Sequence, residues 1–276
     1  RTTQQTLGGA NSTTFYNLIE NGLAGKTTLL INTSIANNLT ITAGTLDIGL
    51  FTCNGNGGTF SVANSATAIF LLQGAFPTGF ATVTLGSASV ITYSGATAQV
   101  IYPVAAPGYG FLNITNTAGA TAGGNLVVQN TVTISSGAIL DASNSGNYDI
   151  SLGLNWTNNG GTFLQRAGTV TFTGTVAQAI NGTDVNQTFH HLHVNKTLAL
   201  TVPATLNING NLTLTSGTLT AGTSIFIGGN MTNNGGVFTA GVGTVTFNGV
   251  TQAIAGSVPT TVGYLLPVLE RLPLMV

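Results

Sequence analysis

Charged side chains are what this sequence has least of. Only 4% of its 276 residues are Asp, Glu, Lys or Arg, against roughly 25% in an ordinary soluble domain. The five Lys and Arg residues are scattered along the chain, so there is no basic patch to neutralise phosphates and we expect no nucleic-acid partner. The sequence also lacks a run of about 18 apolar residues, so we expect no membrane-spanning helix.

Cysteine, helical periodicity and the composition of a disordered chain are missing as well. The single cysteine, Cys53, excludes an internal disulfide. No stretch places apolar residues at the 3.6-residue spacing of an amphipathic helix. Disorder usually accompanies low hydrophobicity and high net charge, whereas 43% of these residues are hydrophobic, the mean hydropathy is +0.39 and the net charge is −1. We therefore expect a folded chain with a large buried core.

Threonine, glycine and asparagine take the place of the missing charged residues. The chain contains 47 Thr, 38 Gly and 28 Asn. Thr favours strands, as do the Val, Ile and Phe residues of the sequence, whereas Gly and Asn favour tight turns. This composition predicts an all-β protein.

The chain repeats itself over a long period. The phrase NWTNNGGTF at 155–163 returns as NMTNNGGVF at 230–238. A phrase built around glutamine occurs four times, at 3–9, 98–104, 177–183 and 251–257. These repeats predict successive modules of about 75 to 95 residues, at about 1–98, 99–177 and 178–251, with the start of a fourth at 252–263.

A shorter period lies inside the modules. GNLTLTSGTLTAG at 210–222 matches GNMTNNGGVFTAG at 229–241 at an offset of 19 residues, and SIFIG at 224–228 matches TVTFN at 244–248 at an offset of 20. A solenoid repeats in this way because one coil of chain is one repeat and like residues stack on like.

We therefore predict a single right-handed parallel β-solenoid over residues 1–263, with coils of about 19–20 residues. Leu212 should then lie next to Met231, and Leu219 next to Phe238. Tandem β-sandwich modules of about 100 residues are the alternative, although a sandwich has no reason to repeat every 19 or 20 residues.

Alternation within each coil separates the core from the surface. Leu212 is expected inside and Thr213 outside. The TNNGG phrase is expected to form a corner, because Gly and Asn tolerate positive φ. The apolar residue before it, Trp156 or Met231, then fills the core. Cys53 aligns with the same slot and is expected to be a small buried hydrophobe.

The repeats resemble those of a known group of proteins. GNLTLTSGTLTAG, NWTNNGGTF and GTVTFTGTVAQAI followed by TFHHLHVN are similar to repeats of large secreted bacterial surface proteins and adhesins. These are β-helical in the broad manner of filamentous haemagglutinin and autotransporter passengers. The resemblance covers nearly all of residues 1–263 and carries no catalytic residues. It implies a structural or adhesive fibre segment, extracellular or on the cell surface.

Two features depart from the repeat. Glu20 takes a position where the matching segments have Ile114 and Val194, so an apolar residue is expected there. The apolar tail YLLPVLERLPLMV at 264–276 contains no Gly, Thr, Asn or Ser. It is interpreted as a cap, a strand exchanged with a neighbour, or a misread or frame-shifted end.

Few side chains are candidates for chemistry. Of the six acidic residues, Asp47 and Asp141 sit at matching corners a whole module apart. That position suits a turn residue, which bonds its own backbone, better than the paired carboxylates of a glycosidase. We expect no enzyme and predict no catalytic residue and no cofactor site.

The densest polar cluster is formed by His190, His191 and His193. On a strand, His191 and His193 share one face, as two metal ligands would. Asp184 is the one acidic residue near them in sequence. We interpret the cluster as part of a polar surface strand and predict no metal site.

The sequence favours an extracellular structural or adhesive role. An ice-binding or carbohydrate-binding solenoid is the alternative, because Thr213 would stack on Thr232 and Thr220 on Thr239. A polysaccharide-degrading β-helix enzyme ranks below both. Because 3–18 aligns with 251–265, we expect head-to-tail self-association into a filament, or adjacent repeats of a longer chain. A surface or glycan ligand is a further candidate partner.

Overall fold

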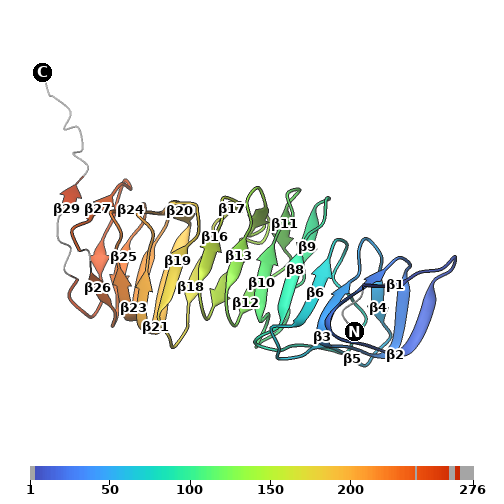
Figure 1. Ribbon diagram of the computed structural model, residues 1–276. Helices are drawn as coiled ribbons and strands as arrows, with labels where there is room; N and C mark the ends of the chain where they lie inside the picture. Colours follow the sequence, from blue (N-terminus) through green and yellow to red (C-terminus); the bar gives the residue numbers. More distant parts are fainter. Residues whose placement is uncertain (1–3, 240, 261–264, 268–276) are drawn as a thin grey trace, which may run out of the picture. The chain divides into compact units, whose positions relative to one another are not determined.

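The computed structural model describes residues 4–239, 241–260 and 265–267 (Figure 1). This part of the chain consists of strands and loops without any helix, so no helix in it is available to cross a membrane. Parallel strands stack in a β-solenoid of about 12 turns, which confirms the all-β solenoid prediction. The chain divides into two compact units, residues 1–168 with 182–184 and residues 169–181 with 185–276.

The first unit contains the strands β1 to β17. They are β1 (Gln5–Leu7), β2 (Thr13–Leu29), β3 (Thr33–Asp47), β4 (Cys53–Gly55), β5 (Thr59–Val62), β6 (Ala68–Leu72), β7 (Thr82–Leu85), β8 (Val90–Tyr93), β9 (Gln99–Ile101), β10 (Phe111–Ile114), β11 (Ala120–Ala122), β12 (Leu126–Val128), β13 (Val132–Ile134), β14 (Ile139–Asp141), β15 (Ile150–Leu152), β16 (Trp156–Asn158) and β17 (Thr162–Leu164).

Strands one coil apart pair in parallel, so their interior residues form apolar ladders. The longest ladder in the first unit passes through β3, β6, β8, β10, β13 and β16, and its interior residues are Leu46, Phe70, Ile91, Leu112, Val132 and Trp156. A second ladder joins Leu39, Phe60 and Val83 on β3, β5 and β7. A third joins β9, β11, β14 and β17. Because sandwiches are antiparallel, the tandem-sandwich alternative is wrong.

The second unit contains the strands β18 to β29. They are β18 (Thr169–Phe172), β19 (Gln178–Asn181), β20 (Asn186–Phe189), β21 (His191–Thr201), β22 (Thr205–Ile208), β23 (Leu212–Thr220), β24 (Ser224–Ile227), β25 (Met231–Asn233), β26 (Val237–Thr239), β27 (Thr244–Phe247), β28 (Ile254–Ala255) and β29 (Leu265–Pro267).

The register predicted for the second unit is confirmed. Leu212 pairs with Met231 and Leu219 with Phe238, in parallel. The offset of 20 also holds, since β24 pairs with β27 from Ser224 and Thr244 onward. The predicted sidedness holds too, because the side chains of Leu212 and Met231 are fully buried while Thr213 is half-buried on the outer face.

Coil length varies more than predicted. Corner residues stacked in the second unit, such as Asn211 and Asn230, lie 19 positions apart. In the first unit the corresponding stacked corners lie 20 positions apart at Asn32 and Thr52, but 24 apart at Asn125 and Asp149. The prediction of 19–20 residues per coil is therefore correct for Leu212–Phe247 and too short for much of the first unit.

This variation overturns one sequence alignment. Cys53 was expected in the same core slot as Trp156, but it pairs with Thr33 on β3, whereas the Trp156 ladder leads back through Val132 to Leu46. The two residues therefore belong to different ladders. The expectation of burial is confirmed for both, since Cys53 is 1% and Trp156 0% exposed.

In its copies at 98–104 and 251–257, the glutamine phrase forms a corner that joins one coil to the coil before it. The buried Gln99 accepts a hydrogen bond from the Gly95 N–H (2.8 Å) and donates to the carbonyls of Leu72 (3.3 Å) and Gly74 (2.7 Å). Gln252 repeats the arrangement with the Gly249 N–H and two carbonyls of the preceding coil. An amide suits this position because it can both accept and donate.

The TNNGG phrase forms a second kind of corner. Its first asparagine is buried, and its Oδ1 accepts a backbone N–H from the turn: Gly161 for Asn158 (2.8 Å) and Gly236 for Asn233 (2.9 Å). The second glycine is required because a Cβ at Gly161 would lie 2.6 Å from the Ser135 carbonyl oxygen. The phrase therefore recurs because this turn needs both its amide and its glycine.

The apolar tail at 264–276, interpreted above as a cap, an exchanged strand or a misread end, lies mostly outside the described residues. Its described part, β29 (Leu265–Pro267), pairs in parallel with β27 of the same chain. This part of the tail therefore continues the chain's own sheet.

The inside–outside assignment can be tested by truncation. Trp156→Ala is expected to cost roughly 3–5 kcal/mol, because it removes a fully buried side chain and leaves a cavity. Thr213→Ala, and Thr133→Ala in the same unit as Trp156, are expected to cost under about 0.5 kcal/mol, because both threonines lie on the outer face. The free energy of unfolding would be measured by denaturant titration, and equal losses at core and surface positions would contradict the assignment.

Candidate functional site

The three histidines lie at the start of β21 and on the residue before it. His191 and His193 alternate with the buried Leu192 and Val194, so they share the outer face as expected. The rings of His190 and His191 meet edge to face, with centroids 4.4 Å apart. Together with Asn211 and Thr213, His191 and His193 line a shallow depression of about 290 Å³.

Hydrogen bonds of His191 and His193 connect adjacent coils. His191 Nδ1 accepts the backbone N–H of Asn211 (2.8 Å), in the same way as Asn211 Oδ1 accepts the N–H of Asn230 one coil later (2.8 Å). His193 Nε2 lies 2.8 Å from Thr215 Oγ1, and burial lowers the pKa of His193. Within the described ranges no group of three or more His, Cys, Asp or Glu residues could hold a metal ion.

The two candidate carboxylates do not form a pair. Asp47 lies on the ladder of β3 and β6, whereas Asp141 lies on that of β11, β14 and β17, so the corners do not match as expected from the sequence. Their role in turns is confirmed, because each accepts the N–H two residues on, Gly49 for Asp47 and Ser143 for Asp141 (both 2.9 Å).

Each of these carboxylates is also ion-paired with a base on a neighbouring coil. Asp47 is 2.6 Å from Lys26 Nζ. Asp141 receives two hydrogen bonds from the Arg166 guanidinium, at 2.8 and 2.7 Å. The Arg166 guanidinium lowers the pKa of Asp141 below its usual value. Sequence reasoning missed both bases, because neither lies near its aspartate in the chain.

Cys53 shows no sign of a reactive thiol. It is 1% exposed, and burial raises the pKa of its thiol to about 12. A reactive cysteine needs a lowered pKa and access to solvent. The expectation of a small buried hydrophobe is therefore confirmed.

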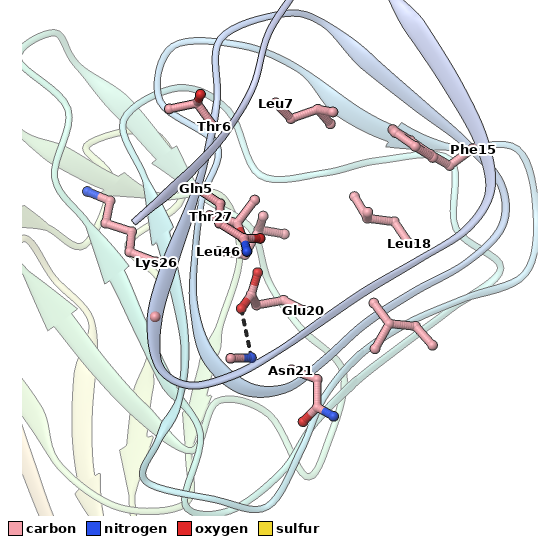
Figure 2. Close-up of a pocket in the computed structure, with 13 residues that line it drawn as sticks. Gln5, Thr6, Leu7, Phe15, Leu18, Glu20, Asn21, Lys26, Thr27 and Leu46 are labelled. Carbon is pink, nitrogen blue, oxygen red and sulfur yellow. Dashed lines mark hydrogen bonds between the residues drawn. The ribbon is translucent and has the colours of Figure 1, made fainter. Parts of the chain in front are cut away.

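A pocket lies in the first coil of the first unit, inside the turn made by β1 and β2 (Figure 2). Its volume is about 400 Å³. Figure 2 shows Leu7, Phe15, Leu18 and Glu20 pointing into the space that this coil encloses, with Lys26 directed away from Glu20. The walls thus combine five apolar side chains with six polar ones, and Glu20 is the one carboxylate among them.

Glu20 occupies the interior position where an apolar residue was expected. It pairs with Ile41, which pairs with Val62, which pairs with Leu85, so it heads an otherwise apolar column. Its side chain is 8% exposed, and its Oε1 accepts the Gly22 N–H at 3.0 Å. The one sign of this pocket in the sequence was that Glu20 takes a position where the matching segments have an apolar residue.

Comparisons with protein-family models, with curated proteins and with solved structures found no match. The resemblance to bacterial surface proteins and adhesins therefore rests on the repeat phrases alone.

The Asp141–Arg166 pair predicts a specific pH dependence. Because the folded-state pKa of Asp141 is depressed, its contribution to stability is complete above the unfolded pKa of about 3.9 and is lost as pH falls through the folded pKa. Asp141→Asn should therefore be less stable than the parent at pH 7, and the difference should shrink in strong acid. Denaturant midpoints measured across this range would test it, with Arg166→Gln as a parallel variant. A difference independent of pH would contradict the assignment.

The polar sites also lead to a negative expectation. Purified protein is expected to show no turnover of common polysaccharides and no stoichiometric divalent metal, because Asp47 and Asp141 are engaged by Lys26 and Arg166. Reducing-end assays and elemental analysis would check this. Reproducible turnover that disappears in Asp141→Asn would contradict it.

Proposed function

We propose that this protein is a non-enzymatic structural or adhesive component, located outside a cell or on the surface of a bacterial cell. In this proposal the solenoid is a stiff scaffold that adds end to end, either to further copies or to adjacent repeats of a longer chain. A structural role then depends on the stacked coils, and an adhesive role on the side chains that the coils expose.

The observation that carries the proposal is the stacking of coils at both the core and the corners. Interior residues such as Leu212 and Met231 form apolar ladders, while corner side chains such as Gln252 and Asn211 bond the backbone of the adjacent coil. In the second unit, adjacent coils are thus joined both at the core and at the corners, and this nearest-neighbour stacking supports a role as a scaffold.

The first coil supports the proposal of end-to-end addition. Among the described residues, β2 pairs with β3 along its length and with β1 only at Thr27–Leu29. The remaining edge, from Thr13 to Lys26, offers a backbone template for another parallel strand. Tyr16, Ile19 and Leu23 on the outer side of this strand are 71%, 63% and 75% exposed, so this end also presents apolar surface.

The threonine columns favour ice binding less than the sequence suggested. Thr213 does stack on Thr232, and Thr220 on Thr239. However, His193 precedes Thr213 in its column and Ala255 follows Thr232. We therefore do not include ice binding in the proposed function.

Self-association can be tested on the chain 1–276. Light scattering and electron microscopy over a concentration series are expected to show linear particles that grow with concentration, and deletion of 264–276 is expected to weaken growth. Leu18→Lys should also weaken it, because it places a charge inside the open coil, whereas Tyr16→Lys on the outer side of the same strand should have little effect. Monodisperse monomers of both the full chain and the shortened chain at high concentration would refute the assembly proposal.

A further inference from the structure

The chain contains eight asparagines that are followed directly by glycine. They are Asn21, Asn54, Asn56, Asn159, Asn181, Asn209, Asn234 and Asn248. In such a sequence the backbone nitrogen of the glycine can attack the side-chain carbonyl carbon of the asparagine, and glycine hinders the attack least because it has no side chain. The glycine N–H must first lose its proton. A glycine N–H that is held in a hydrogen bond therefore protects the asparagine before it.

Six of the eight glycine N–H groups are held in this way, over distances of 2.7 to 3.3 Å. Their donors and acceptors are Gly22 to Glu20 Oε1, Gly55 to the Thr78 carbonyl, Gly57 to the Gly79 carbonyl, Gly210 to the His190 carbonyl, Gly235 to Asn233 Oδ1 and Gly249 to Gln252 Oε1. The asparagines before these six glycines are protected to that extent.

The other two glycines, Gly160 and Gly182, find no acceptor for their N–H in the part of the chain that the structure describes. Gly182 is wedged against the neighbouring coil, because a Cβ built on it would lie 1.9 Å from the Asn158 carbonyl oxygen. At Gly160 a Cβ would meet nothing closer than 3.7 Å. Only at Gly160, therefore, is a free N–H combined with room for the backbone to rotate as a ring closes.

The two copies of the TNNGG corner differ in this respect. Asn159 and Asn234 are the second asparagine of the same five-residue phrase. Gly160 adopts a φ of +90° and leaves its N–H free, whereas the Gly235 N–H bonds Asn233 Oδ1 at 3.3 Å. A Cβ on Gly235 would also lie 2.6 Å from the Thr215 carbonyl oxygen. Exposure would rank the two corners in the opposite order, because Asn234 is exposed and Asn159 is half-buried.

We propose that Asn159 is a site of spontaneous deamidation in the folded protein. Hydroxide or a basic buffer group removes the Gly160 N–H proton, and the nitrogen forms a bond to Asn159 Cγ. The bond from Cγ to Nδ2 breaks, and the departing nitrogen takes up a proton and leaves as ammonia. Water then opens the five-membered succinimide ring at either carbonyl, which gives aspartate or isoaspartate.

The modification adds a carboxylate to a chain that has very few charges. The formal net charge changes from −1 to −2, since one negative charge is gained. Asn159 follows β16 directly, so the new charge lies at a corner and outside the interior ladders. The adjacent Asn158 still accepts the Gly161 N–H at 2.8 Å, which keeps the turn attached to its strand.

The proposal is tested by following deamidation residue by residue in the chain 1–276. The folded protein would be incubated in mildly alkaline buffer, digested at acid pH, where the ring does not form, and mapped by mass spectrometry. Asn159 is expected to react about tenfold faster than Asn234, because a tenfold difference in rate corresponds to about 1.4 kcal/mol, the size of one hydrogen bond that must be broken first.

The same chain in denaturant is the matched control. There the two TNNGG phrases have lost their corners, so Asn159 and Asn234 are expected to react at equal rates. A folded-state rate at Asn159 that is equal to or below that of Asn234 overturns the proposal. An excess at Asn159 that persists unchanged in denaturant also overturns it, because the cause would then be the flanking sequence.

A pair of variants gives an independent measurement by isoelectric focusing. The aged parent is expected to develop one main acidic form. Asn159→Gln should abolish this form, since a glutamine would need a six-membered ring, whereas Asn234→Gln should leave it in place. Persistence of the acidic form in Asn159→Gln, or its loss in Asn234→Gln, would assign the reaction to another residue and refute the proposal.

Discussion

The in-register stacking of one coil on the next is the constraint on which the rest of this protein depends. A parallel strand satisfies its backbone groups only where the neighbouring coil offers its own N–H and C=O groups at the same height. The side chains must then match as well, because each interior residue lies directly on its equivalent one coil away. The ladder from Leu46 to Trp156 is the result, and its positions hold apolar side chains of different shapes.

The same constraint accounts for the scarcity of charge. At a corner, the backbone leaves both donors and acceptors that the ladder does not use, and an amide side chain serves both. Gln99 accepts from one N–H and donates to two carbonyls, which neither a carboxylate nor an ammonium group can do. Four of the charged residues neutralise one another across coils, as Asp47 does with Lys26 and Asp141 with Arg166.

The sequence was most informative where coil length is constant. The unbroken offset of 19 residues was enough to predict that Leu212 pairs with Met231. Where corners lengthen, phrases that look alike fall on different ladders, as Cys53 and Trp156 do. The turn role of Asp141 could be predicted because its partner Ser143 is local. Arg166 could not be foreseen, since it lies 25 residues away and its approach depends on the length of the coil between them.

The longer corner between β14 and β15 shows how such a protein can change without losing its fold. Residues 142–149 make this corner, and Ser143 and Asn147 adopt positive φ within it, yet Val132 still pairs with Trp156 on the next coil. Extra sequence at a corner is thus absorbed outside the ladders. For protein engineering, this corner is a natural graft point, where a foreign peptide can be displayed at a fixed height on the scaffold while the coils on either side keep their register.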